Sequence, residues 1–187
     1  MKILFWKSLV AGLAFVASVV NAAPVSCPAS PVNYVSLVSG AAECQYDTSV
    51  GQDFNHNPLT VNTQAFFGAD DWTVIKHGEG QSGASGSWAL DDDIWNSFGE
   101  IMLVFKSGSL QSGSFLVAFL LEAGVTSGEW ITPFRSPLFD FKNPRDLSHI
   151  SYYGRGTPVV SVPESSPLAL MLLGLLGLAV ARRKARK

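Results

Sequence analysis

The most concentrated acidic residues in the chain are three consecutive aspartates, Asp91, Asp92 and Asp93. Hard cations such as calcium take several oxygen ligands, and a loop between strands can supply carboxylates together with carbonyls. Adjacent strand residues point to opposite faces, so these three aspartates can share a cation only within a loop. The EF-hand spacing of ligands is absent. We therefore expect a solvated acidic loop without a metal or other cofactor, with a calcium site as the alternative.

Four tryptophans are candidates for stacking on sugar rings, as a polysaccharide-binding domain would require. They are Trp72, Trp88, Trp95 and Trp130. A tryptophan contributes the same apolar area whether it fills a core or contacts a ligand, so the sequence leaves both roles open. Core positions are the simpler expectation for each of them.

Residues for catalysis are sparse. The three histidines, His56, His77 and His149, are scattered, and no HExxH motif occurs. The segment Gly80-Gln81-Ser82-Gly83 does not have the glycine spacing of a nucleophile elbow. Two facing carboxylates could support glycoside hydrolysis, but the sequence does not single out any one pair among its fourteen acidic residues between positions 23 and 162. We predict no enzyme, and keep a secreted carbohydrate-active hydrolase as the alternative function.

The basic residues are unevenly distributed along the 187-residue chain. The whole chain has thirteen lysines and arginines and fifteen acidic residues. Residues 23–162 contain only six of the basic residues but fourteen of the acidic ones, so their net charge is −8. The remaining seven basic residues lie at the two ends of the chain. A domain this acidic is a poor candidate for nucleic-acid binding, which requires clustered cations. Both ends are apolar as well as basic, which indicates addressing segments.

Residues 1–22 have the three parts of a secretory signal peptide. Lys2 and Lys7 form the positive region, an apolar stretch follows, and small residues precede the predicted cleavage site after Ala22. Cleavage after Ala23 would place Pro24 beside the scissile bond, so we favour the first position. This segment predicts Sec-dependent export, and an uncleaved membrane helix is the alternative.

Export affects the interpretation of the two cysteines, Cys27 and Cys44. Sixteen residues separate them, and an oxidising compartment favours one intrachain disulfide, worth about 3 kcal/mol in the chain-entropy model. We expect it to join the first strand to the following loop. Free thiols and an intermolecular bond remain as alternatives.

Residues 161–187 form a second addressing segment. Residues 168–181 are uncharged and, as a helix, would be about 21 Å long, shorter than the roughly 30 Å hydrocarbon core. Basic side chains at the end of the helix could reach the membrane interface and so compensate for its short length. They should remain on the cytoplasmic side of the membrane. These residues are Arg182, Arg183, Lys184, Arg186 and Lys187. The expectation is a transmembrane helix that anchors an exported domain.

The order of this segment resembles the PEP-CTERM sorting signal of Gram-negative bacteria that make extracellular polysaccharide. Val162, Pro163 and Glu164 match the start of the motif, Ser165 replaces the usual second proline, and the apolar stretch and basic cluster follow. The resemblance implies processing by exosortase, a membrane protease-transpeptidase. The protein would cross the inner membrane, be anchored there transiently, and then reach the cell surface or the extracellular matrix.

Between the two addressing segments, residues 23–160 have the pattern of one all-β domain. Short apolar or β-branched runs are separated by glycine- and serine-rich segments, and no amphipathic helix is evident. The predicted strands are residues 72–76, 101–105, 115–121, 130–134 and 147–153. This spacing is typical of an antiparallel β-sandwich, jelly-roll-like, with little helix.

The domain also resembles the ectodomains that often accompany this sorting signal. The similarity rests on the early cysteine pair, on residues 85–88 and 95–98, on the strand at 101–106, and on residues 128–134 and 147–153. It implies an adhesive or structural role in biofilm, with exopolysaccharide as a candidate partner.

Overall fold

The computed structural model describes residues 23–47, 57–78, 81–108 and 115–158. The predicted signal peptide (1–22) and the predicted sorting segment (161–187), including the predicted membrane helix, lie outside the described residues. The described chain is mostly β, and its helices are one four-residue α-helix, α1 (Thr60–Thr63), and three short 3-10 turns, η1 (Val35–Leu37), η2 (Phe66–Gly68) and η3 (Ile94–Asn96).

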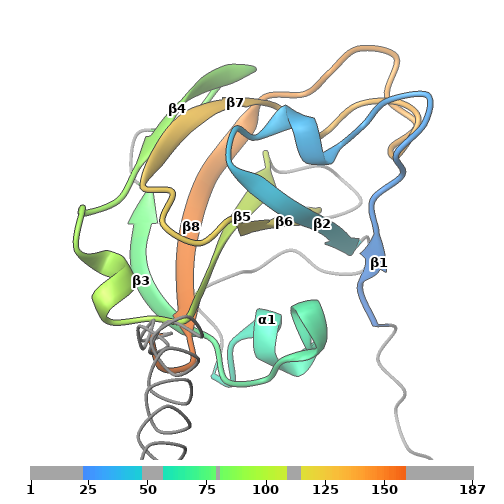
Figure 1. Ribbon diagram of the computed structural model, residues 1–187. Helices are drawn as coiled ribbons and strands as arrows, with labels where there is room; N and C mark the ends of the chain where they lie inside the picture. Colours follow the sequence, from blue (N-terminus) through green and yellow to red (C-terminus); the bar gives the residue numbers. More distant parts are fainter. Residues whose placement is uncertain (1–22, 48–56, 79–80, 109–114, 159–187) are drawn as a thin grey trace, which may run out of the picture.

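Two antiparallel sheets make up the fold (Figure 1). The larger has the order β1-β2-β6-β5-β8-β3, and the smaller pairs β4 with β7. The strand bounds are β1 (Val25–Ser26), β2 (Ala41–Asp47), β3 (Thr73–Gly78), β4 (Ser85–Ala89), β5 (Glu100–Ser107), β6 (Leu116–Leu121), β7 (Ser127–Ile131) and β8 (Leu147–Arg155). The predicted antiparallel all-β class is confirmed, and each of the five predicted strands overlaps an observed one.

The long apolar runs of β5 and β6 are explained by burial on both faces of the larger sheet. Ile101, Leu103 and Phe105 of β5 pack into a core cluster together with the tryptophans of β4 and β7. Met102 and Val104 face the opposite side, where the cluster includes Val61 of α1. Because both faces are covered, β5 and β6 need apolar residues at nearly every position. Figure 1 shows the small sheet and α1 on opposite sides of the larger sheet.

Strand β4 was not predicted, because Ser85-Gly86-Ser87 has the composition of a turn. Its partner β7 explains why it forms. In the register of the pair, Gly86 lies opposite Trp130 and Gly128 lies opposite Trp88. Each indole thus occupies the space left by a glycine on the facing strand.

Strand β7 begins and ends earlier than the predicted run at 130–134. It ends at Ile131, and Thr132 donates one further backbone hydrogen bond to Ala84 at 2.8 Å. The next residue, Pro133, has no N–H and so cannot extend the ladder. The chain then turns away and carries Phe134 into the core.

Candidate functional site

Three of the four candidate tryptophans are core residues. Trp72 and Trp88 are 1% exposed and Trp130 is 2% exposed. Trp95 is half-buried, and its indole N–H donates to the carbonyl of Val125 at 3.0 Å. The interpretation of these tryptophans as an exposed sugar-stacking strip is therefore wrong for Trp72, Trp88 and Trp130, and their predicted core role is confirmed.

The three aspartates at 91–93 lie in an exposed turn that leads into η3, as expected for a loop. Within the described residues, no group of three or more histidine, cysteine or carboxylate side chains is placed to hold a metal ion. Asp91, Asp92 and Asp93 belong to no such group, and calcium ligation there stays the alternative prediction. Asp71, which lies elsewhere in the sequence, accepts a hydrogen bond from Arg155.

The predicted disulfide between Cys27 and Cys44 is present, with the two Cα atoms 5.3 Å apart. The backbone N–H of Cys27 also donates to the carbonyl of Cys44 at 2.9 Å. One detail of the prediction is wrong. Cys44 lies in strand β2 rather than in a loop, because pairing with β6 on its other side draws this segment into the sheet.

The histidines within the described chain lie on neighbouring strands of the larger sheet. His77 is an exposed residue of β3 paired with Ser151, and His149 of β8 pairs with Lys106. The Nδ1 atom of His149 lies 3.3 Å from the hydroxyl of Ser148. His56 lies outside the described residues.

Arg155, at the end of β8, joins elements from three parts of the chain. Its guanidinium donates to Glu100 at 2.5 Å and to Asp71 at 3.1 Å, and lies over the ring of Trp72. Burial lowers the pKa of this guanidinium, but the hydrogen bonds and negative charges of Glu100 and Asp71 outweigh burial, so the pKa of Arg155 is raised overall. The side chains of Asp71 and Glu100 are 57% and 43% exposed, and their contacts with Arg155 link β8 to β5 and to the segment before β3.

Tyr34 and Tyr152 are fully buried and use their hydroxyls to fasten loops to the core. Tyr34 donates to the carbonyl of Arg135 at 2.7 Å and accepts from the N–H of Leu138 at 3.1 Å. Tyr152 donates to the side-chain oxygen of Gln81 at 3.1 Å. Burial raises the pKa of both phenols.

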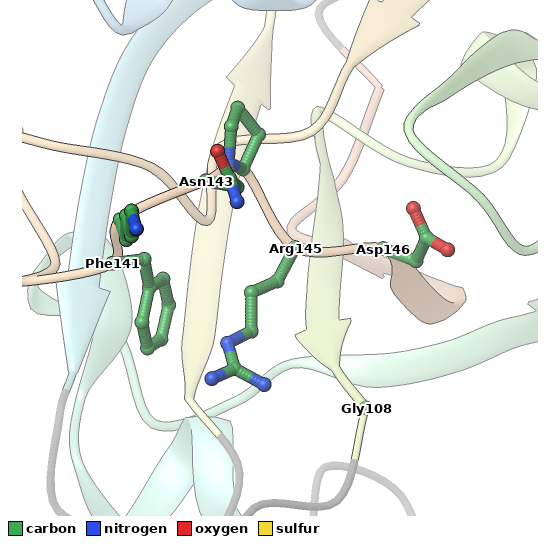
Figure 2. Close-up of a pocket in the computed structure, with 7 residues that line it drawn as sticks. Gly108, Phe141, Asn143, Arg145 and Asp146 are labelled. Carbon is green, nitrogen blue, oxygen red and sulfur yellow. The ribbon is translucent and has the colours of Figure 1, made fainter.

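A cleft of about 510 Å³ lies beside the segment that precedes β8. Its wall includes Phe141, Lys142, Asn143, Arg145 and Asp146 (Figure 2). The guanidinium of Arg145 lies 4.8 Å from the centre of the Phe141 ring. In Figure 2 the side chain of Asp146 points away from that guanidinium. The cleft lining thus includes aromatic, cationic, amide and carboxylate groups.

Hydrogen bonds to neighbouring segments hold the backbone of this wall in place. The N–H of Arg145 donates to Phe134 at 2.9 Å, and the hydroxyl of the buried Thr132 donates to the carbonyl of Arg145 at 2.6 Å. Leu147 then exchanges backbone hydrogen bonds with Gly83. The cleft wall is therefore attached to the core even though its side chains are exposed.

Sequence reasoning missed this cleft. The available signal was Lys142 and Arg145, two of only six basic residues between positions 23 and 162, three residues apart and next to Phe141. That spacing alone carries no information about a cavity, which forms only when the segment folds against the end of the sheet.

Comparison of the chain with protein-family models, with curated proteins and with solved structures found no match. In the part of the chain that the structure describes, no helix is long and apolar enough to cross a membrane. The predicted membrane helix at 168–181 lies outside that part.

Proposed function

We propose that this protein is exported and sorted by exosortase, and that its β-domain has an adhesive or structural role at the cell surface or in an exopolysaccharide matrix. The observation that carries the proposal is the order of three features at the carboxy terminus. The motif residues Val162, Pro163 and Glu164 are followed by the uncharged stretch 168–181 and by the basic residues 182–187. The signal-peptide pattern at 1–22 supports export independently.

The disulfide supports the proposed compartment. Disulfides persist in oxidising environments outside the cytoplasm and are rare where thiols are kept reduced. The Cys27–Cys44 bond therefore agrees with a domain that acts after export.

We further propose that the domain is a β-sandwich of the jelly-roll type. The support is the packing of the small sheet on one face of the large one. Phe105 of β5 meets Trp130 of β7 edge-on, with ring centroids 5.7 Å apart, and Trp88 of β4 lies in the same core cluster. Two antiparallel sheets that share a core in this way are the defining feature of sandwich architectures.

Mass spectrometry of the termini of the native protein tests the sorting proposal. We expect a mature amino terminus at Ala23 and a carboxy terminus within the motif, so that the residues from 168 onward are absent. A surface-located protein that retains Lys187 would contradict exosortase processing.

Motif variants make this test sharper. Replacing Pro163 and Glu164 by alanine and glutamine should leave the tail intact and the protein in the membrane fraction. Ser166→Ala, outside the three matching positions, is the matched control and should be processed normally. Equal processing of the two variants would show that exosortase does not recognise the motif.

A further inference from the structure

We propose that the cleft at residues 141–146 binds a carboxylate-bearing sugar unit of an acidic polysaccharide. This inference rests on the proposed extracellular role and specifies the ligand that the domain contacts. The cleft volume of about 510 Å³ falls within the range of roughly 300–1,000 Å³ that is common for ligand sites.

The cationic side of the cleft accounts for recognition of the carboxylate. Arg145 and Lys142 are both exposed, and no ion pair joins either of them to a described carboxylate. A guanidinium presents its donors in a planar fork that matches a carboxylate. The Phe141 ring holds the guanidinium of Arg145 on one side, which reduces the conformational entropy lost when a ligand binds.

The remaining polar groups distinguish a sugar from a simple anion. Asp146 accepts hydrogen bonds only, whereas the amide of Asn143 both donates and accepts. The Asn143 amide suits the hydroxyls of a sugar ring, and the carboxylate of Asp146, which points away from the Arg145 guanidinium (Figure 2), can accept from a more distant hydroxyl. A uronic acid unit combines one carboxylate with several hydroxyls and so fits this mixed set of groups.

The rigid attachment of the wall supports a binding role. Thr132 is fully buried and donates to the carbonyl of Arg145, and the N–H of Arg145 donates to Phe134. The backbone at Arg145 is therefore fixed by the core. Within an acidic domain, this arrangement offers an anionic polymer a local point of contact.

The test is binding of tri-galacturonate to the exported, disulfide-bonded protein by titration calorimetry, with the methyl ester of the same trisaccharide as the uncharged ligand. We expect tri-galacturonate to bind and the ester to bind at least tenfold more weakly. Arg145→Gln and Lys142→Gln should each weaken binding about tenfold, as expected for loss of a charged hydrogen bond. Added salt should weaken binding further.

Lys76→Gln is the matched control, because it removes the same charge from β3, where Lys76 contacts Ala89 and Tyr152. It should leave the affinity unchanged. Equal affinity for the acid and its ester, or unchanged affinity in both cleft variants, would overturn the proposal. If tripolyphosphate bound as tightly as tri-galacturonate, the cleft would attract anions by charge alone. That result would also overturn the proposal. None of these results depends on how the termini are processed, so this proposal and the sorting proposal can fail separately.

Discussion

Two glycines on facing strands create the space for two tryptophans in the core. A Cβ atom at Gly86 would lie 2.8 Å from the ring of Trp130, and one at Gly128 would lie 2.8 Å from the carbonyl oxygen of Ser39. Both distances are shorter than real Cβ contacts allow. The repeated Gly-x-Trp sequence of β4 and β7 is therefore explained by packing, because antiparallel pairing places each glycine opposite the other strand's tryptophan.

Gly86→Ala and Gly128→Ala should each destabilise the fold by about 1–3 kcal/mol, because the added methyl group overpacks a closed site. Thermal unfolding followed by circular dichroism measures the loss. Gly108→Ala is the control, since a Cβ there meets no atom within 4 Å. Melting temperatures equal to that of the parent protein for both β4 and β7 variants would contradict this packing.

The buried phenols make stability depend on alkaline pH. Burial raises the pKa of Tyr152 above its ordinary value of 10.0, and the hydrogen bond to Gln81 opposes this only in part. The folded state therefore keeps the phenol proton at a pH where the unfolded chain loses it. The stabilisation is complete below the unfolded pKa and is lost as pH rises through the folded pKa.

We expect the melting temperature to fall as pH rises above about 10, the ordinary pKa of a tyrosine. Tyr152→Phe should be less stable at neutral pH, because it leaves Gln81 without this donor, but its stability should decline less steeply with pH. The measurement is the melting temperature of the parent protein and of Tyr152→Phe at several pH values across this range. Parallel pH profiles would show that Tyr152 does not contribute.

At the scale of elements, the amino-terminal strand depends on covalent attachment. Strand β1 has only two residues, Val25 and Ser26, and pairs with β2 alone at the edge of the sheet. A strand this short gains little from its own ladder. The disulfide beside it joins Cys27 to Cys44 in β2 and so holds the edge strand in register.

Removal of the disulfide by the double substitution Cys27→Ala and Cys44→Ala should cost about 3 kcal/mol, since the unfolded chain is no longer constrained. Chemical denaturation measures this difference. A reducing agent should destabilise the parent protein and have no effect on the double variant. Equal stability of the parent protein with and without reductant would contradict the assignment.

At the scale of the whole molecule, the two core clusters share the same central strands. Met102 belongs to the cluster on the α1 side, and its neighbour Leu103 belongs to the cluster under the small sheet. Damage to one side must therefore strain the strand that serves the other. We infer that the described domain unfolds as one cooperative unit.

Met102→Ala and Leu103→Ala should each destabilise the domain by about 2–5 kcal/mol while unfolding remains a single transition. Tryptophan fluorescence and far-ultraviolet circular dichroism should give coincident curves in both variants. Separate transitions in either variant would show that the two sides of the sheet are independent.

The sequence by itself determined the all-β class and five of the strands, because short apolar runs between glycine- and serine-rich segments exclude long helices. It also predicted the intrachain pairing of its only two cysteines, which the structure then confirmed over free thiols and an intermolecular bond. Its prediction of export and sorting rests on residues 1–22 and 161–187, outside the described structure, and stays a prediction.

Only the tertiary structure decided which aromatic residues are core and where a ligand can enter. Trp88 and Trp130 are buried because glycines lie opposite them in a strand pair that local composition does not predict. Similarly, Arg145 meets Phe141 at a cleft because Thr132, thirteen residues earlier, fastens the intervening segment to the core. Such contacts depend on strand register and on the packing of separate segments. Local sequence patterns do not predict either of these.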